Sequence, residues 1–225
     1  MASAAFTSGC STRWLPAEMA TAARPRLVYL HGFRSSPQSF KARLLADRMA
    51  ERGLASRFVC PQLPASPAAA IERVLRDIAP EAADTLVGSS LGGYYATWLA
   101  ERCGCRAVLL NPAIFPARDL AVHTGTQRMY HSDDEFVFEP GYLDELARLQ
   151  VAVPTRPQRY LLVAAKGDEL LDWREMLARY PGVPTILLEG SDHGLSDFDT
   201  LAGRVLEFAG MTGGAPDPEL PAEQT

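Results

Sequence analysis

The stretch Gly88-Ser89-Ser90-Leu91-Gly92 decides the fold expected for this chain, because of where it stands. It ends the apolar run 84–89, which is typical of a buried strand, and it precedes a helix-like stretch over 91–102. Gly-x-Ser-x-Gly at a strand-to-helix junction is the pattern of a nucleophile elbow, a strained turn that presents a serine hydroxyl above a sheet. Larger side chains in place of the two glycines would collide with the neighbouring strand and helix. Ser90, rather than Ser89, is therefore the candidate nucleophile.

Apolar runs and helix-like segments alternate on both sides of this motif. The expected strands are residues 26–30, 56–60, 84–89, 106–110, 159–165 and 184–189. The expected helices are residues 38–52, 66–78, 91–102, 173–179 and 198–208. Such alternation implies a parallel sheet that helices cover on both faces. We therefore expect an α/β fold on a minimal, mostly parallel sheet of about six strands.

The chain divides into one predicted domain and two flanking segments. Residues 25–210 carry the α/β pattern, whereas residues 1–24 and 211–225 have the composition of disordered segments. The first 18 residues are either such an extension or a start-site error, since Met19 opens a more compact chain. Residues 113–150 show little periodicity. Because long segments of this kind are usually functional, we expect them to form a small cap over the site.

Composition excludes several classes of function. A chain of 225 residues suits one α/β domain, and a formal charge of −5 argues against a nucleic-acid partner. No apolar run approaches the roughly 20 residues that span a bilayer, so no membrane partner is expected. The N-terminal stretch lacks the features of a secretory signal. The four cysteines do not have a metal-site spacing, and we expect reduced thiols in a cytoplasmic protein.

A serine nucleophile needs a general base, and the base needs an acidic partner. The chain has four histidines, of which His193 follows the last expected strand. Asp168 follows the fifth strand, so both residues lie at the carboxyl edge of the sheet, where ligands of such sheets bind. The order Ser90, Asp168, His193 fits a hydrolase triad. Glu169 and Asp172 compete with Asp168 as the acid, and His193 could instead be a loop histidine that bonds a neighbour.

The residues that carry a family resemblance are Tyr29-Leu30-His31-Gly32-Phe33, Gly88 to Ala96, Leu110-Asn111-Pro112-Ala113, Gly167-Asp168-Glu169 with Leu171-Asp172, and His193. With these motifs the chain resembles the α/β-hydrolase superfamily and, within it, the small YqiA-type bacterial esterases. The resemblance implies hydrolysis of esters or thioesters, with Ser90 as nucleophile, Asp168 as acid and His193 as base. It also implies an oxyanion hole from the backbone N–H groups of Leu91 and Phe33.

One departure from the superfamily pattern concerns the size of the sheet. The His-Gly turn of the superfamily normally follows the third strand of an eight-stranded sheet, but His31-Gly32 follows the first expected strand. The chain therefore resembles a minimal version that lacks the two leading strands.

The remaining candidate residues carry weaker signals. His31 is expected to shape the oxyanion turn, with substrate contact as the alternative. Tyr94 and Tyr95 are expected to pack in the core, with a substrate-binding, pocket-lining role for one of them, Tyr94, as the alternative. His131 and the acidic residues after it have no metal-ligand spacing, so a solvated acidic face is expected there. The predicted partner is a small-molecule ester or thioester, with no metal and no cofactor. The alternatives are a triad hydrolase of another bond type (acyl-CoA thioester, peptide or carbon–carbon) and a non-catalytic binding protein of this fold.

Overall fold

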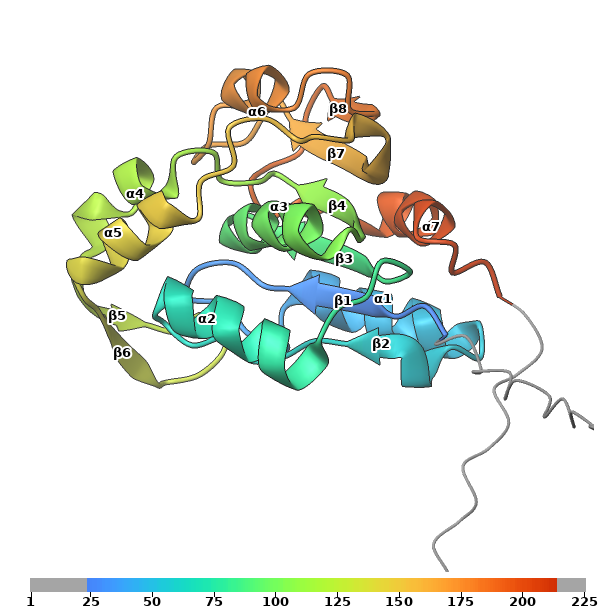
Figure 1. Cartoon of the computed structure of the whole chain (residues 1–225), viewed down its shortest axis with the longest axis horizontal. Coiled ribbons are helices and arrows are strands. Elements are labelled where there is room, and N and C mark those ends of the chain that lie inside the picture. Colours follow the sequence, from blue (N-terminus) through green and yellow to red (C-terminus); the bar gives the residue numbers. More distant parts are fainter. Residues whose placement is uncertain (1–23, 214–225) are drawn as a thin grey trace, which may run out of the picture.

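The centre of the molecule is a six-stranded sheet in which all neighbouring strands are parallel. The computed structural model describes residues 24–213, and its strand order is β2-β1-β3-β4-β7-β8 (Figure 1). The strands are β1 (Leu27–Leu30), β2 (Phe58–Val59), β3 (Thr85–Ser89), β4 (Arg106–Leu110), β7 (Tyr160–Ala165) and β8 (Thr185–Leu188). The predicted α/β fold and its sheet of about six strands are thereby confirmed.

Helices cover both faces of this sheet. The five main helices are α1 (Phe40–Glu51), α2 (Pro67–Arg73), α3 (Leu91–Cys103), α6 (Trp173–Arg179) and α7 (Asp199–Phe208). Successive strand side chains point to opposite faces. Val28 of β1 packs in the cluster that contains α2, α3 and α6, and the next residue, Tyr29, packs in the cluster that contains α1 and α7. Both residues are buried, as expected for a sheet with two covered faces.

The predicted elements of the sheet and its helices agree with the observed ones to within about two residues at most ends. Ser66, the first residue of the predicted helix over 66–78, caps α2: its side chain accepts a hydrogen bond from the Ala69 N–H at 3.1 Å, and Pro67 takes the first helical position. The predicted helix over 66–78 ends in one π-helical turn, Val74–Ile78. Short 3₁₀ turns precede two strands, at Ala55–Arg57 and Pro157–Arg159.

The segment between β4 and β7 holds regular elements that the sequence did not indicate. They are α4 (Pro116–Asp119), a 3₁₀ turn at Ala121–His123, the antiparallel hairpin β5 (Gly125–Arg128) and β6 (Glu135–Phe138), and α5 (Gly141–Arg148). Figure 1 shows these elements gathered at one end of the molecule. Their strands and first helix have only four residues each, which is too short for a periodic pattern to be read from sequence.

This segment is bonded to the rest of the domain at two places, the hairpin and α5. At the hairpin, the Arg34 carbonyl accepts a hydrogen bond from the Tyr130 N–H at 2.8 Å, and Arg34 Nε donates to the Arg128 carbonyl at 2.7 Å. At α5, the Tyr94 hydroxyl donates to the carbonyl of Leu146 at 2.7 Å. The Leu146 side chain is fully buried in the same hydrophobic cluster as α3.

The predicted terminal segments lie outside the described residues, apart from Arg24 and residues 211–213. Met211 is buried, and its N–H donates to the Leu206 carbonyl at 2.8 Å, so the packed domain extends one residue past its predicted end. Cys60, Cys103 and Cys105 are free thiols. No helix within residues 24–213 is long and apolar enough to cross a membrane.

The buried position of Leu146 generates a prediction about stability. We expect Leu146→Ala to lower the free energy of unfolding by about 2–5 kcal/mol, because it removes a fully buried side chain and leaves a cavity. Leu170→Ala is the matched control, since that leucine is 65% exposed and should cost less than about 0.5 kcal/mol. Urea unfolding measures both. Equal stability of the two variants would show that α5 does not belong to the core.

Candidate active site

Ser90 occupies a strained turn between β3 and α3. Its backbone angles are φ 54° and ψ −119°, a conformation that non-glycine residues rarely adopt. The turn is held from both sides, because the Ser90 N–H donates to the Leu110 carbonyl at 3.0 Å and the Ser90 carbonyl accepts from the Ala113 N–H at 3.1 Å. The hydroxyl therefore has a fixed position at the carboxyl edge of the sheet.

The two glycines of the motif have the steric role expected from the sequence. A Cβ atom on Gly92 would lie 1.9 Å from the Leu30 carbonyl oxygen, and one on Gly88 would lie 2.2 Å from the Gly92 carbonyl oxygen. Both contacts are with backbone atoms, which cannot rotate away. The first turn of α3 thus lies directly against the end of β1, and only glycine permits that approach.

A continuous series of hydrogen bonds joins Ser90, His193 and Asp168. His193 Nε2 lies 3.1 Å from Ser90 Oγ, and His193 Nδ1 lies 2.9 Å from Asp168 Oδ2 and 3.1 Å from Oδ1. The Asp168 side chain is completely buried, whereas 18% of the His193 side chain is exposed. The N–H groups of Leu170 and Leu171 also donate to Asp168 Oδ1, so the carboxylate has a fixed orientation. The structure brings together all three residues that the sequence selected.

The competing acids Asp172 and Glu169, and also Asp192 beside the histidine, are engaged elsewhere. Asp172 caps α6, where it accepts a hydrogen bond from the Arg174 N–H at 2.8 Å. Glu169 accepts from the backbone N–H of His193 at 2.9 Å and so holds the loop rather than the imidazole ring. Asp192 accepts from the Ser196 N–H at 2.9 Å. None of these three carboxylates has a hydrogen bond to the His193 ring among the described residues.

Asn111 holds the loop that carries His193. Its motif contributed to the family resemblance, but this role was not predicted. Its Nδ2 donates to the carbonyls of Asp192 and His193 at 3.0 and 3.3 Å, and its Oδ1 accepts from the Ala165 N–H at 2.9 Å. Asn111 is fully buried and has a positive φ of 42°, which asparagine tolerates better than most residues. The sequence feature that could have predicted this role is the position of Asn111, a polar residue directly after an apolar strand.

Lys41 is a second residue that the sequence did not single out. It lies on α1, only 9% exposed, and its Nζ donates to the Gly194 carbonyl, one residue after His193. Its position in the predicted helix over 38–52 gave no sign of a role at the site. The structure places α1 beside the loop that holds His193, which brings Lys41 Nζ to the Gly194 carbonyl.

The predicted oxyanion donors lie beside Ser90. Leu91 is the first residue of α3, and Phe33 follows Gly32, whose added Cβ would lie 3.7 Å from Ser90 Oγ. Among the described residues, neither the Phe33 nor the Leu91 N–H has a hydrogen bond to another protein group. Two backbone donors near the serine hydroxyl are therefore available to a bound oxygen atom.

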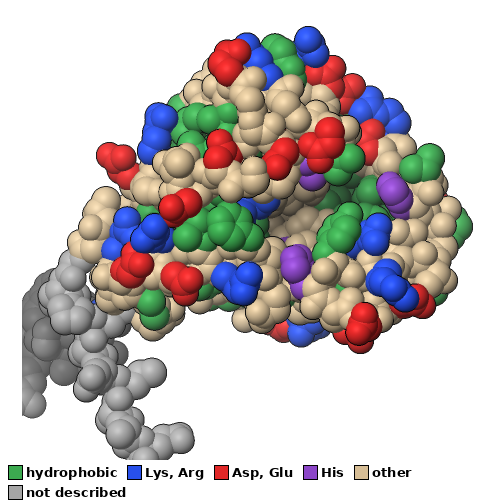
Figure 2. Space-filling view, turned by 180° about the vertical axis from the view of Figure 1, so that it is seen from behind, with side chains coloured by type: hydrophobic (Ala, Val, Ile, Leu, Met, Phe, Trp, Pro, Cys, Tyr) green, Lys and Arg blue, Asp and Glu red, His purple; other side chains and the backbone are tan. Residues whose placement is uncertain are grey.

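A cavity of about 420 Å³ opens in front of Ser90 and His193. Its wall includes apolar side chains from α1, the segment over 113–150 and the loop after β7, namely Phe40, Pro116, Leu120, Leu170 and Leu171. Figure 2 shows a hollow in this part of the surface with histidine side chains at its edge. Such a mixed, mostly apolar cleft with a few polar groups is typical of a small-molecule site.

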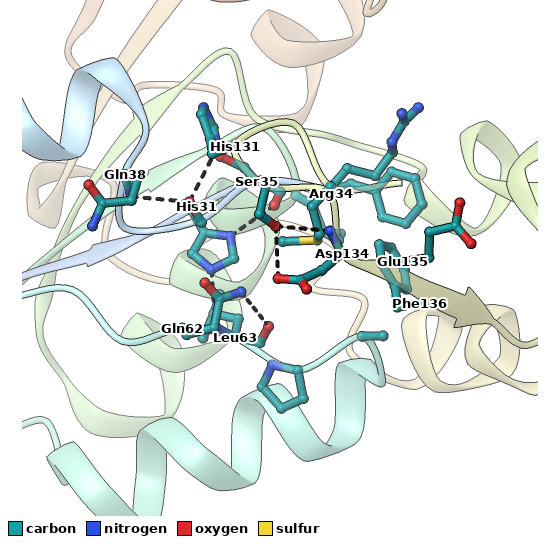
Figure 3. Close-up of a pocket in the computed structure, with 18 of the residues that line it drawn as sticks. His31, Arg34, Ser35, Gln38, Gln62, Leu63, His131, Asp134, Glu135 and Phe136 are labelled. Carbon is teal, nitrogen blue, oxygen red and sulfur yellow. Dashed lines mark hydrogen bonds between the residues drawn. The ribbon is translucent and has the colours of Figure 1, made fainter. Parts of the chain in front are cut away.

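A second cavity of about 460 Å³ adjoins the first and shares part of its wall, including Phe33, Leu91 and His131. Figure 3 shows this second cavity, with His31 and His131 among the residues that line it. His31 lies on this side: its Nε2 accepts from the Leu63 N–H at 3.0 Å, and its Nδ1 lies 3.0 Å from the Gly32 carbonyl. Burial lowers the pKa of His31, which agrees with a neutral ring in this arrangement. The prediction that His31 shapes the turn is therefore consistent with its contacts.

Two further predictions concern Tyr94 and the acidic segment after His131. Tyr94 does not line either cavity, because its ring packs between α3 and α5 and its hydroxyl is bonded to the Leu146 carbonyl. Its contacts are those of the core packing that was the default expectation, and not those of the pocket-lining alternative. Within residues 24–213, no cluster of three or more histidine, cysteine or acidic side chains could hold a metal ion.

Solved structures with this architecture are α/β-hydrolases. α/β-hydrolase domain-containing protein 10 from mouse has a TM-score of 0.60 and 18% identity, over 81% of this chain and 88% of that chain. Est1E from Butyrivibrio proteoclasticus, in a structure with ferulic acid bound, has a TM-score of 0.60 and 14% identity, over 82% and 87%. A structure of the metagenome-derived lipolytic enzymes LipS and LipT has a TM-score of 0.62 and 19% identity, over 83% and 93%. The protein therefore has the α/β-hydrolase fold.

The family can be stated more narrowly. A model described as "Uncharacterised protein family (UPF0227)" matches residues 26–210, and the chain belongs to that family. The match covers the whole predicted domain. Together with the structural likenesses, it confirms the resemblance to α/β-hydrolases of the YqiA type.

The close approach at Gly92 can be tested by substitution. Because a Cβ there would meet backbone at 1.9 Å, we expect Gly92→Ala to cost at least about 2 kcal/mol of unfolding free energy. Gly203→Ala is the matched control, since Gly203 lies within α7 with no atom within 4 Å of its added Cβ. That variant should gain roughly 0.5–1 kcal/mol in urea unfolding. Wild-type stability of Gly92→Ala would contradict the steric account of the turn.

Proposed function

We propose that this protein is a serine esterase that hydrolyses carboxylic esters or thioesters through an acyl-enzyme. The observation that carries the proposal is the series of hydrogen bonds from Ser90 through His193 to Asp168, at the carboxyl edge of the sheet. The α/β-hydrolase fold supports it, since this fold often presents its nucleophile on such a turn. Esterase and lipolytic names among the structural neighbours add support at the level of the reaction class.

In the proposed reaction, Ser90 Oγ attacks the carbonyl carbon while His193 Nε2 accepts the hydroxyl proton. The 3.1 Å separation of these atoms suits that transfer. Asp168 accepts the Nδ1–H hydrogen bond, which keeps Nε2 unprotonated before attack and stabilises the imidazolium that forms. Because Asp168 is buried and bonded to two backbone N–H groups, it holds the ring without leaving its place.

The negative charge that develops on the carbonyl oxygen needs donors already in position. We assign this role to the N–H groups of Phe33 and Leu91, two residues that line the same cavity as Ser90 and whose N–H groups have no hydrogen bond to a described protein group. Losing one such donor typically raises the barrier by about 2.7–4 kcal/mol. Collapse of the tetrahedral intermediate expels the alcohol or thiol, which takes the proton from His193. Water, activated by the same histidine, then releases the acid from Ser90.

The nucleophile assignment is tested by Ser90→Ala. We expect that variant to lose turnover of p-nitrophenyl esters by at least about 10⁴-fold and to lose labelling by a fluorophosphonate. Ser89→Ala is the matched control from the same turn and should keep both, with mass spectrometry placing the label on residue 90. Labelling that survives in Ser90→Ala would refute the assignment. Failure of the wild type to react at all would instead favour a non-catalytic binding protein.

The acid assignment is tested by comparing two aspartates of the same loop. Asp168→Asn should lower kcat by about 10⁴-fold, because the amide no longer holds the required tautomer of His193. Asp172→Asn should keep most of the activity, since that side chain caps α6. Steady-state kinetics with one ester measures both. An equal loss in the two variants would contradict the assignment of Asp168.

A further inference from the structure

Lys41 is a buried cation in the wall of the cavity that also contains Ser90 and His193. It projects from α1, and only 9% of the residue is exposed. The chain uses arginine for most of its positive charge: among its 22 basic residues, only Lys41 and Lys166 are lysines. Lys166 has the usual environment of a surface lysine, with its Nζ 2.7 Å from a carboxylate oxygen of Glu189. Lys41 differs in both respects, burial and pairing.

The ammonium group of Lys41 has spare hydrogen-bonding capacity. It carries three N–H donors, and its one hydrogen bond within residues 24–213 is to the Gly194 carbonyl. No ion pair joins it to a described carboxylate. A buried charge is costly unless it is paired and hydrogen-bonded. In agreement with this, burial lowers the pKa of Lys41 to about 8, although Asp192 and Asp168 pull it upward through space.

We propose that Lys41 binds a carboxylate carried by the substrate, so that the enzyme prefers esters with a free carboxylate to neutral esters. This proposal rests on the proposed esterase function and specifies its substrate class. A substrate carboxylate would supply the missing counter-charge and accept the free N–H donors, which forms a charge-assisted hydrogen bond in a partly dehydrated site. The contact would lie beside the catalytic base, because Gly194 follows His193 in the chain.

The nearby acidic groups are not available for this pairing. Asp168 already accepts hydrogen bonds from His193 Nδ1 and from two backbone N–H groups. Asp192 accepts from the Ser196 N–H, and its attraction reaches Lys41 only through space. Asp119, which also lines the cavity, is paired through Oδ1 with Arg118 at 2.7 Å; its buried Oδ2 has no hydrogen-bond partner among the described residues, but its charge is not among those that act on Lys41. The other charged or titratable groups that line the cavity are Tyr29, Arg34, His123, Tyr130, His131 and His193.

The proposal predicts how substrate preference depends on pH. Lys41 is charged below its pKa of about 8 and neutral above it, so the preference for an anionic ester is present at low pH and is lost as the pH rises through 8. Any effect of pH on the reaction steps that the two esters share changes the rates of both. The ratio of kcat/KM for a charged ester and its neutral twin cancels that common part, and kcat/KM reports the free enzyme.

The experiment uses two pairs of esters that place the charge on opposite sides of the scissile bond. The first pair is the mono-p-nitrophenyl ester of adipic acid and its methyl ester, which carry the carboxylate or its neutral twin on the acyl side. The second is 4-acetoxybenzoate and its methyl ester, for the alcohol side. In one of the pairs the wild type should prefer the anionic ester by about tenfold or more at pH 6.5, the size typical of a hydrogen bond to a charged group.

Lys41→Met should remove this preference at every pH, because methionine retains a similar length without the charge. Lys166→Met is the matched control and should retain both the preference and its loss above pH 8. Equal ratios in the wild type and in Lys41→Met for both pairs would overturn the proposal. A preference for the anionic ester that survives in Lys41→Met would also overturn the proposal. The pH profile of the wild type tests the assignment even if Lys41→Met does not fold.

A binding measurement separates this proposal from the esterase function. In Ser90→Ala, monomethyl adipate or 4-acetoxybenzoate should raise Tm more than the corresponding methyl ester does, and adding Lys41→Met should abolish the difference. If no ester is hydrolysed by the wild type but this difference is present, the esterase function fails and the carboxylate site stands. If esters are hydrolysed and neither kinetics nor Tm distinguishes the charged compounds, the carboxylate site fails alone.

Discussion

The close approach of α3 to the end of β1 is the constraint on which the site depends. Gly92 leaves no room for a side chain against the Leu30 carbonyl, so the helix begins immediately above the sheet. That position forces Ser90 into a positive φ and directs its hydroxyl outward. The cost of this strained residue, of order 1–3 kcal/mol, must be met by the packing around it. The buried strands on either side provide that packing.

A second level of organisation joins the ends of three strands. Asn111, after β4, donates to the loop that follows β8 and accepts from the last residue of β7. Lys41, on α1, also holds this loop, because its Nζ donates to the Gly194 carbonyl. His193 is thus positioned by groups from distant parts of the chain rather than by its own loop. A histidine on an exposed loop can in this way acquire a defined position next to a serine of another loop.

The sequence predicted the elements whose formation depends on residues close together in the chain. The strands of the main sheet are continuous apolar runs because both of their faces are buried, and the Ser66-Pro67 start of α2 follows from capping. The hairpin between β5 and β6 was not predicted, since strands of four residues carry too little pattern and their burial depends on partners far away. The choice between core and pocket for Tyr94 stayed open for a related reason. A helix position does not reveal which later segment will pack against it.

The sequence by itself determined the order along the chain of the main-sheet strands and their helices, the turn at Ser90, and the nucleophile and base of the proposed triad, with Asp168 as the favoured acid. It could do so because glycine sterics and the parallel α/β pattern restrict the possible folds. In such a sheet the functional residues lie at the carboxyl ends of the strands, where the sequence places these candidates. Only the tertiary structure decided which carboxylate faces His193, how residues 113–150 shape the cavity, and that Lys41 is buried in its wall. Burial, pairing and cavity shape arise from contacts between segments distant in the chain, and no local pattern encodes them.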